Sequence, residues 1–430
     1  MFKNFLVIGL LLVASVNNPY YTCGSSNSSN NSTSGISGAD ITPSTTLPPE
    51  NTIVLESNLK PNSEQSGTNN LWSVQNNGVN LRALSYQDKS TSFAPQISPD
   101  KAKILFWSNR PLNSSSETSP NNLWVMGIDG SNPQALTQST LIESMNTWET
   151  AQYSPDGSKI IFLSSRNLNL SNHDAENPSL NIWIMNSDGS DLHPLTRFDT
   201  RTVLSQLKWF PDGNNIAFLS NLNPEIENTR QANLLNIWTL QKDGSHLQPV
   251  THLQHATVSD YDWSPDNSKF VFTSNMPSEG TDIVPLRSNL KLWTIANNSS
   301  QLTLLTAVAN SSNTHPLWSP NGKQIVYISN RKTDSTDFGI SNNNLWIYNF
   351  EGNTNTPVTK LVNDSIQHSP VKWSKDSKKI LFISNRHTDK SDKINSNGIS
   401  NLWMISTDGN DLGNVTGLNK SGQIIGLSDW

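Results

Sequence analysis

The sequence predicts an all-β fold, a β-propeller of seven blades with four antiparallel strands in each. Three observations predict it. A unit of about 55 residues recurs along the chain, each unit carries two hairpin signals, and the first and last units are incomplete in complementary ways. The chain has 430 residues, and a single core rarely reaches that size unless repeats build it up.

The most regular element of the repeat is Leu or Ile followed by Trp. Seven copies occur, and successive tryptophans are separated by 52, 59, 55, 55, 53 and 57 residues. The copies are Leu71-Trp72, Leu123-Trp124, Ile182-Trp183, Ile237-Trp238, Leu292-Trp293, Leu345-Trp346 and Leu402-Trp403. Because these tryptophans occupy equivalent positions, we expect them to pack between blades and not to form seven ligand sites.

Two hairpins in each unit give four short strands. The first hairpin is an aromatic residue, a turn of the Ser-Pro-Asp-Gly type and an apolar run, as in residues 153–163 and 318–328. The second follows Leu-Trp, turns at Asp-Gly or a relative, and ends in Leu-Thr or a similar pair. Its turns include Asp129-Gly130, Asp188-Gly189, Asp243-Gly244 and Asp408-Gly409. Four-stranded sheets repeated radially form a propeller. The alternative is an array of β-sandwiches, but units of about 55 residues are too short to close one.

The two ends of the chain predict how the ring closes. Residues 52–58 match the second strand of a unit, as in residues 103–109, so the first unit lacks its first strand. Residues 424–430 match a first strand alone, aligned with the segments that end at Tyr153, Trp209, Trp263, Trp318 and Trp373. We therefore expect the C-terminal strand to complete the N-terminal blade, which satisfies strand edges that would otherwise stay open. This count gives seven blades, with six as the alternative.

The N-terminus predicts export. Lys3 precedes an apolar run from Phe5 to Val16, which has the length of a signal peptide and is too short to span a bilayer. Cys23 is the only cysteine, and residues 24–37 are nearly all Gly, Ser, Asn and Thr. This arrangement resembles a bacterial lipoprotein with a lipidated Cys23; alternatively, Cys23 lies in or beside a conventional cleaved signal. We expect a signal peptide at 1–22, a tether at 23–50 and the propeller at 51–430.

Charge and location limit the partners. The formal net charge is −6 and only 15% of residues are charged, so no basic field is available for nucleic acid. We expect a monomer in the periplasm or at the cell surface that contacts the membrane only through a lipid on Cys23. The expected partner is an envelope protein, a peptide or a glycan.

The repeat resembles a known family. The succession Trp-Ser-Pro-Asp-Gly, apolar strand, Ser-Asn-Arg, Asn-Leu-Trp, Asp-Gly-Ser and Leu-Thr is similar to the repeat of TolB-like propellers, also called WD40-like or PD40, over residues 51–430. The resemblance implies an exported propeller that engages its partner through the loop face. Similar repeats occur in propellers fused to serine peptidase domains and in oligogalacturonate lyases.

Strand direction predicts where a ligand would bind. The tight turns fall on one face, and the long loops at 110–121, 166–180, 275–289 and 386–401 fall on the other, which we expect to be the binding face. First strands line the centre of a propeller, and their starts diverge between units. The candidate ligand-binding residues at this predicted channel mouth are Trp148, Glu149, Gln206, Asp260, His315 and His368. The alternative is that these side chains only fill or hydrate the channel.

Arginines recur at one further position of the repeat. Arg110, Arg166, Arg331 and Arg386 each follow Ser or Ser-Asn at the end of a second strand. We expect them to hold neighbouring loops, although a shared anion-binding rim is the alternative.

Catalytic motifs are absent from the sequence. It contains no Gly-x-Ser-x-Gly, His-Glu-x-x-His, P-loop or EF-hand pattern, and the pair His252 and His255 has no evident third metal ligand. We therefore expect a non-catalytic binding or scaffold protein with no catalytic residues, metal or cofactor. The alternative is a carbohydrate-active enzyme similar to seven-bladed oligogalacturonate lyases, with His315 and His368 in a metal-binding cluster.

Overall fold

The computed structural model describes most of the repeat region and leaves the N-terminus out. It describes residues 52–59, 68–85, 90–112, 120–138, 151–165, 168, 180–198, 202–225, 230–231, 234–280, 289–306, 311–333, 340–361, 371–386, 390, 399–418 and 424–427. The chain divides into two units, Met1–Gly38 and Ala39–Trp430, and the first lies wholly outside the described residues. The signal peptide, the tether and the lipidated Cys23 therefore stay predictions. Within these ranges, no helix is long and apolar enough to cross a membrane.

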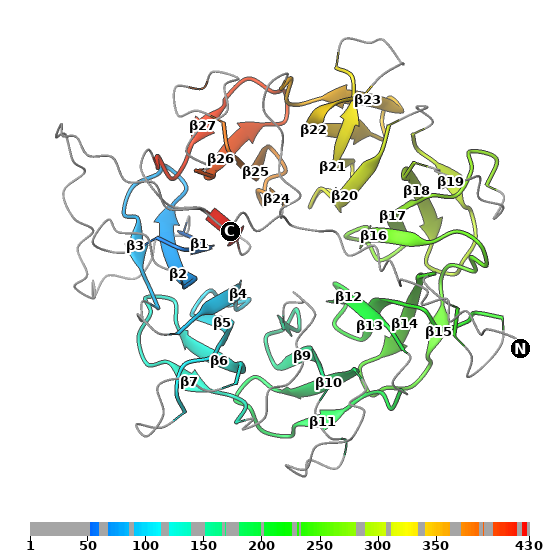
Figure 1. Ribbon diagram of the computed structural model, residues 1–430. Coiled ribbons are helices and arrows are strands. Elements are labelled where there is room, and N and C mark those ends of the chain that lie inside the picture. The colour runs from blue at the N-terminus through cyan, green and yellow to red at the C-terminus, as the bar shows by residue number, and fades with distance from the viewer. Residues whose placement is uncertain are drawn as a thin grey trace, which may run out of the picture. The chain divides into compact units, whose positions relative to one another are not determined.

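Seven four-stranded antiparallel sheets form a seven-bladed propeller, which confirms the predicted fold class and blade number (Figure 1). We name each blade by its strands, from the innermost strand outward. The blades are β28 (Ile424–Leu427), β1 (Thr52–Ser57), β2 (Asn70–Gln75), β3 (Arg82–Ala83); β4 (Ser92–Ile97), β5 (Lys103–Ser108), β6 (Asn122–Gly127), β7 (Gln134–Ala135); β8 (Gln152–Tyr153), β9 (Lys159–Ser164), β10 (Asn181–Asn186), β11 (His193–Pro194); β12 (Leu204–Trp209), β13 (Asn215–Ser220), β14 (Asn236–Gln241), β15 (Gln248–Pro249); β16 (Val258–Trp263), β17 (Lys269–Ser274), β18 (Lys291–Ala296), β19 (Thr303–Leu304); β20 (Asn313–Trp318), β21 (Gln324–Arg331), β22 (Ile340–Asn349), β23 (Thr354–Pro357); and β24 (Lys372–Trp373), β25 (Lys379–Ser384), β26 (Asn401–Ser406), β27 (Gly413–Asn414).

The C-terminal strand completes the N-terminal blade, as predicted. β28 pairs antiparallel with β1, and the register places Leu427 opposite Leu55 and Gly426 opposite Glu56. We call this blade the split blade, because its strands come from both ends of the sequence. The structure describes β28 up to Leu427, and the last three residues of the predicted strand lie outside the described ranges.

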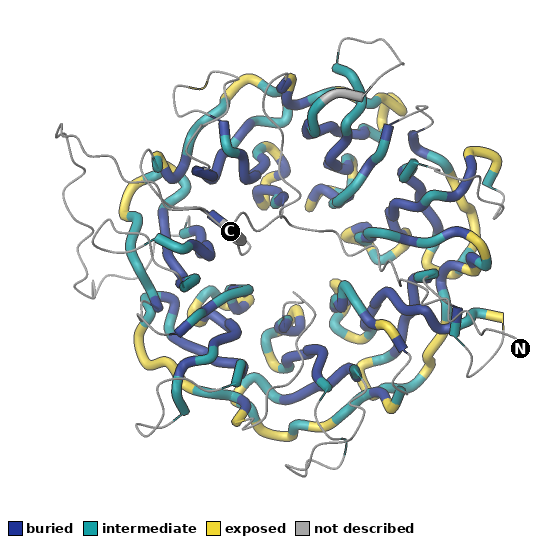
Figure 2. The backbone as a smooth tube through the Cα atoms, viewed as in Figure 1, coloured by how far each residue is buried: buried dark blue, intermediate teal, exposed yellow. Residues whose placement is uncertain are grey.

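The core is built between neighbouring blades. In one cluster, Ile161 and Ile182 of one blade pack with Leu204 and Phe218 of the next. Figure 2 shows the buried residues along the middle strands of each blade and the exposed residues at the outer turns. All seven tryptophans of the third strands are buried, which agrees with the predicted packing role. The repeat is thus apolar at the same positions because each blade covers its neighbour.

A buried hydroxyl explains why each unit has a Ser or Thr at a fixed distance after its third-strand tryptophan. In all seven blades, the backbone N–H of the residue before Trp donates to a Ser or Thr hydroxyl fourteen residues later, as from Ile237 to Thr251 at 2.9 Å. In five blades this hydroxyl donates to the side chain of an Asn two residues before the third-strand tryptophan, as from Thr251 to Asn236 at 2.8 Å. The motif is therefore a closed polar network inside an apolar core.

The Asp-Gly turns are required by contacts between blades. Gly130 and Gly244 have φ of +87° and +83°, where a residue with a side chain is strained. A Cβ at Gly130 would lie 2.8 Å from the carbonyl oxygen of Leu84 in the split blade, and one at Gly244 would lie 2.7 Å from that of Leu195. Glycine thus satisfies both the turn and the close approach of the neighbouring blade.

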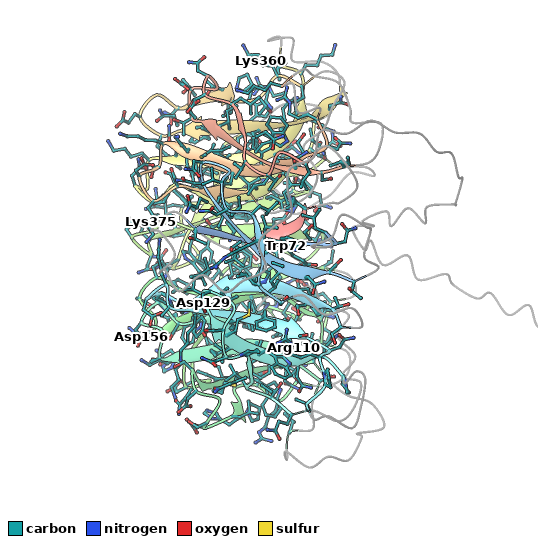
Figure 3. All side chains as sticks on the ribbon, turned by 90° about the vertical axis from the view of Figure 1, so that its left-hand side faces the viewer. Trp72, Arg110, Asp129, Asp156, Lys360 and Lys375 are labelled. Carbon is teal, nitrogen blue, oxygen red and sulfur yellow. The ribbon has the colours of Figure 1, made fainter. Side chains whose placement is uncertain are left out.

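Figure 3 shows Asp129, Asp156 and Lys375 on one side of the blades and Arg110 on the opposite side. The tight turns therefore share one face, as the strand directions predicted. The long loops expected on the other face lie largely outside the described residues.

The Ser-Pro-Asp-Gly turns predict an acid-sensitive contribution to stability. The Asp156 carboxylate accepts from the Ser154 hydroxyl at 2.5 Å and from the Ser158 N–H at 3.0 Å, and these bonds lower its pKa to about 2. Since the pKa is lower in the folded state, this stabilisation is present above pH 4 and is lost as the pH falls through 2. Asp156 is exposed, so we expect Asp156→Ala to cost at most about 1 kcal/mol at pH 7 in urea unfolding.

Asp156→Asn is the matched control for that measurement. In the turn before β21, Asn321 makes the same two contacts, from Ser319 at 2.7 Å and from the Lys323 N–H at 3.0 Å. The Asn variant should therefore keep most of the stability and lose the pH dependence. An unchanged acid profile in Asp156→Asn would contradict this account.

Candidate inner-strand site

The innermost strands bring equivalent residues of consecutive blades together. β4, β12, β16 and β20 lie around the centre of the ring and each have six residues (Figure 1). Their third residues are Ala94, Gln206, Asp260 and His315. Three of the six predicted ligand-binding residues thus share one position on three consecutive blades.

The backbone at this position is unusual. The pairing of β4, β12 and β20 with the next strand is interrupted by bulges, and Ala94, Gln206 and His315 have φ of +51°, +52° and +52° within them. Positive φ is uncommon for residues other than glycine, and a bulge changes the direction of a side chain. In these three strands the backbone conformation at the third position is therefore the same, and it changes the direction of the third side chain. The residue type at this position differs between blades.

Hydrogen bonds connect Gln206, Asp260 and His315 across three blades. The Gln206 side-chain amide donates to an Asp260 carboxylate oxygen at 3.1 Å, and the other carboxylate oxygen accepts from the backbone N–H of His315 at 3.3 Å. The Tyr261 hydroxyl donates to the Gln206 carbonyl oxygen at 2.5 Å. All three side chains are half-buried. We call Gln206, Asp260 and His315 the inner-strand row; it presents an amide, a carboxylate and an imidazole in fixed order.

A second level of contacts joins the inner strands two residues later. The fifth-position side chain of one blade accepts the sixth-position N–H of the next blade: Gln96 from Tyr153 at 2.7 Å, Gln152 from Trp209 at 3.4 Å, and Asp262 from Trp318 at 2.9 Å. Lys208 cannot accept, and it instead donates to the Tyr261 carbonyl at 2.8 Å and to Asp262 at 3.3 Å. This level holds blades together and places the inner-strand row.

Glu56 is a buried carboxyl that the sequence prediction missed. It lies on β1 of the split blade and is 6% exposed. Its carboxylate accepts from the Asn69 side chain at 2.8 Å and from the backbone N–H of Ala94 at 3.1 Å. Burial raises the pKa of Glu56 to about 7, although both hydrogen bonds act in the opposite direction. Aligning the second strands of all units would have revealed it, because no other unit has a charged residue there.

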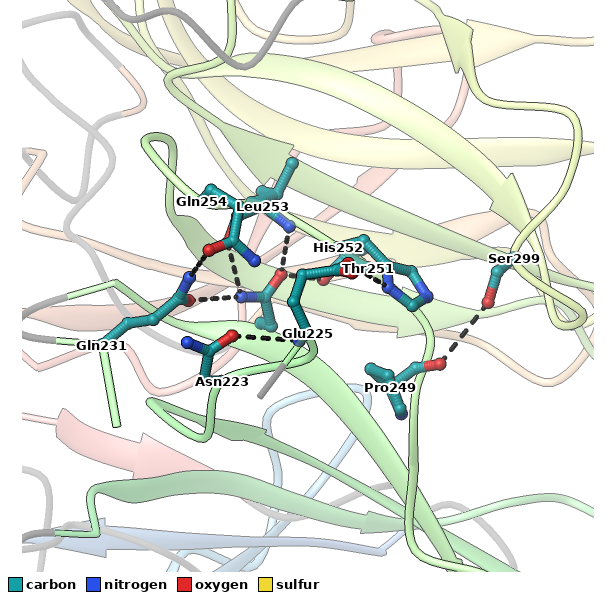
Figure 4. A network of polar contacts seen from close by, with 10 residues as sticks. Asn223, Glu225, Gln231, Pro249, Thr251, His252, Leu253, Gln254 and Ser299 are labelled. Carbon is teal, nitrogen blue, oxygen red and sulfur yellow. Dashed lines mark hydrogen bonds and ion pairs between the residues drawn. The ribbon is translucent and has the colours of Figure 1, made fainter. Parts of the chain in front are cut away.

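The other predicted site residues are not brought together in the described ranges. Trp148, Glu149 and His368 lie outside them, so a pairing of His315 with His368 is untested. His252 contacts Glu225 at 3.1 Å beside the Gln231–Gln254 hydrogen bond of 2.7 Å (Figure 4). Both side chains of that His–Glu pair are about half exposed. Among the residues described, no group of three His, Cys, Asp or Glu could hold a metal ion.

The repeated arginines lie over tryptophan rings. The guanidinium carbons of Arg110, Arg331 and Arg386 lie 5.2, 4.7 and 5.3 Å from the ring centres of Trp124, Trp346 and Trp403. Arg386 also donates to the Lys390 carbonyl at 3.0 Å, which holds the loop that follows it. Cation–π packing and loop contacts therefore explain these arginines. Arg166 lies outside the described ranges.

No family model matches the chain, but two curated proteins do. The uncharacterized peptidase YuxL of Bacillus subtilis is 26% identical over 132 residues, which are 31% of this chain and 18% of that protein. Dipeptidyl-peptidase 5 of Porphyromonas endodontalis is 23% identical over 282 residues, 55% of this chain and 38% of that protein. The chain thus spans well under half the length of either relative.

Solved structures agree on the fold. A puromycin-hydrolyzing peptidase of Mycobacterium tuberculosis matches with a TM-score of 0.59 and 10% identity, over 85% of this chain and 52% of that one. An oligogalacturonate lyase of Vibrio parahaemolyticus matches with a TM-score of 0.54 and 15% identity, over 79% and 83%. TolB of Acinetobacter baumannii matches more weakly, with a TM-score of 0.42 and 18% identity over 71% and 63%, and adds nothing to the fold assignment.

The prediction of a non-catalytic binding or scaffold protein is wrong, because the relatives found by sequence are peptidases. The prediction depended on the absence of local catalytic motifs. Such motifs report only chemistry carried by residues close together in sequence, whereas a propeller brings together side chains more than 50 residues apart. The alternative, an enzyme, agrees better with the comparisons.

Proposed function

We propose that this chain acts in peptide hydrolysis as the substrate-holding propeller of a peptidase. The observation that carries the proposal is the inner-strand row, in a chain that is similar in sequence to two peptidases over part of its length. Because the chain covers only part of its relatives, the activity stands as a proposal.

The chemistry of the row suits a peptide. An extended peptide offers N–H donors and C=O acceptors in alternation, and the row offers a carboxylate acceptor between an amide and an imidazole, both of which donate and accept. Gln206 and Asp260 are fixed by contacts with the next blade, so little ordering is needed when a ligand binds.

The charges of the inner strands favour a peptide over an acidic sugar. Asp260 and Asp262 both lie on β16, and the ammonium of Lys208 is within 3.3 Å of Asp262. An acidic oligosaccharide would meet these carboxylates at a site with little uncompensated positive charge, and like charges disfavour association. This argument separates the proposal from the lyase alternative.

Turnover and binding measured on the full chain test the proposal. Chromogenic peptides with free and with blocked N-termini, and separately oligogalacturonate, would be incubated with the purified protein, and peptide binding would be measured by calorimetry. Peptide turnover or saturable peptide binding supports the proposal. Lyase turnover of oligogalacturonate without any peptide binding would overturn it.

Changing the row should weaken peptide binding or turnover at least tenfold. The double variant Asp260→Asn with His315→Ala removes one charged acceptor and one imidazole. A tenfold weakening equals about 1.4 kcal/mol, which is the size of one hydrogen bond to a charged group. The exposed pair Lys323–Glu351 on the turn face supplies the control, Lys323→Ala, which should bind as the parent does. A double variant that binds peptide normally, with a normal melting temperature, would show that the row only joins blades.

A further inference from the structure

Glu56 occupies a position that is uncharged in every other blade. It pairs with Leu71, the residue before the third-strand tryptophan, and the register identifies its equivalents in the other second strands. These are Trp107, Leu163, Leu219, Thr273, Ile328 and Ile383, all of them buried. The split blade, where the ring closes, therefore carries the one carboxyl at this position.

The carboxyl connects two blades. One oxygen accepts from Asn69, just before β2 of the split blade, and the other accepts from the backbone N–H of Ala94 on β4 of the next blade. Gly426 lies opposite Glu56 on β28, and Phe93 of β4 lies opposite Trp107, the equivalent of Glu56, so neither inner strand carries a polar side chain at this level. The Glu56 carboxyl therefore supplies the polar contact from the split blade to β4 at this level.

No charged partner faces Glu56 from the strands packed around it. β2, β4 and β28 contain no charged or titratable residue. Lys103 is the only charged residue of β5 and lies at its first position, whereas Glu56 lies at the fifth position of β1. Arg110, beyond the end of β5, lies over the rings of Phe106 and Trp124. Among the described residues, an ionised Glu56 would therefore be a buried charge held by two neutral donors.

We propose that Glu56 makes the joint between the split blade and the blade of β4 proton-controlled, so that the joint is firm when the carboxyl is protonated and opens more readily when it is ionised. A device of this kind would couple the closure of the ring to the pH outside the cell membrane. It does not depend on the proposed peptidase function.

The direction of the pH effect follows from the linkage between proton binding and opening of the joint. Burial raises the pKa of Glu56 from 4.5 to about 7 in the closed joint, and opening exposes the carboxyl to water, where its pKa returns toward 4.5. The stabilisation is complete below pH 4.5 and is lost as the pH rises through 7. Between pH 5 and pH 8, the equilibrium constant for opening should rise on the order of 50-fold.

Hydrogen exchange of the full chain tests this proposal. The exchange rates of amides in residues 92–97 would be measured from pH 5 to 8 and divided by those of an unstructured peptide, which removes the intrinsic effect of pH. In the parent, we expect this ratio of exchange rates to increase on the order of 50-fold from pH 5 to 8; we call this increase the excess. In Glu56→Gln, which keeps the shape and cannot ionise, the excess should disappear.

The chain contains its own control joint. Leu163 is the equivalent of Glu56 in the blade of β9, and residues 204–209 on the next blade, which include no histidine, aspartate or glutamate, should show no excess from pH 5 to 8. If Glu56→Gln does not fold, Glu56→Leu, which has the residue of two other blades, takes its place, and the pH profile of the parent remains decisive. A parent without excess exchange, or a neutral variant that retains it, would overturn the proposal.

Discussion

Removal of residues 424–430 should cost on the order of 5 kcal/mol of folding free energy and split or broaden the unfolding transition. β28 provides the innermost strand of the split blade, and Ile424 is buried in a cluster with Ile53, Leu55 and Ile383. The deletion removes several backbone hydrogen bonds at about 1 kcal/mol each and at least one buried apolar side chain at about 2 kcal/mol. Since a domain is stable by only about 5–15 kcal/mol, most of the stability margin should be lost.

Calorimetry and urea unfolding measure that loss, and size-exclusion chromatography measures its consequence. Without β28, the edge of β1 is open to pairing with another chain, so the variant should also aggregate. Deletion of residues 24–37 is the matched control, because we expect it to leave the melting temperature unchanged. Two truncations that both melt like the parent would mean that closure by β28 contributes nothing to stability.

Asn236→Ala should destabilise the protein by roughly 3–5 kcal/mol. Asn236 is fully buried; its carbonyl oxygen accepts from the Thr251 hydroxyl and from the Leu253 N–H, and its amide donates to Gln231 and to the Leu253 carbonyl. The alanine leaves several of these groups buried without partners, at about 1–3 kcal/mol each. Urea unfolding of the variant at neutral pH gives the difference.

The blade of β16 shows why the loss is specific to Asn236. Lys291 stands at the equivalent position there, and Asn313 of the following blade donates instead to Thr306 at 3.0 Å and to the Leu290 carbonyl at 3.0 Å. The equivalent of Asn313 in the blade that follows Asn236 is Val258, whose side chain cannot donate a hydrogen bond. Lys323→Ala, in an exposed ion pair, should change the free energy of unfolding by less than about 0.5 kcal/mol. A loss below 1 kcal/mol in Asn236→Ala would contradict the importance of the network.

The fold could be predicted because the repeat records contacts that every blade must make. Each third-strand tryptophan is buried against its neighbours, and each Asp-Gly turn fits beneath a carbonyl of the previous blade, so selection for packing leaves the same residues at the same spacing. The closing strand could be predicted for the same reason. Its end, predicted at residue 430, lies outside the described residues and stays a prediction.

The site could be predicted only in part. Gln206, Asp260 and His315 were found because they differ between units at a fixed distance from the repeated aromatic residue. The positive φ that re-aims Gln206 and His315 leaves no sequence signal. Glu56 was missed because it looked like a member of an apolar strand. Its importance comes from burial and from the absence of neighbouring charge, which only the folded chain shows. The function was missed because the repeat specifies architecture.

The fifth-position hydrogen bonds have a direction around the ring. Gln96 reaches the backbone of Tyr153, and Gln152 reaches that of Trp209, so each blade secures the one that follows it. At this level, a change at Gln152 therefore loosens the contact with the downstream blade and leaves its own inner strand with its upstream support from Gln96. For substitutions at these fifth positions, local disorder should appear in the blade that follows the substituted one.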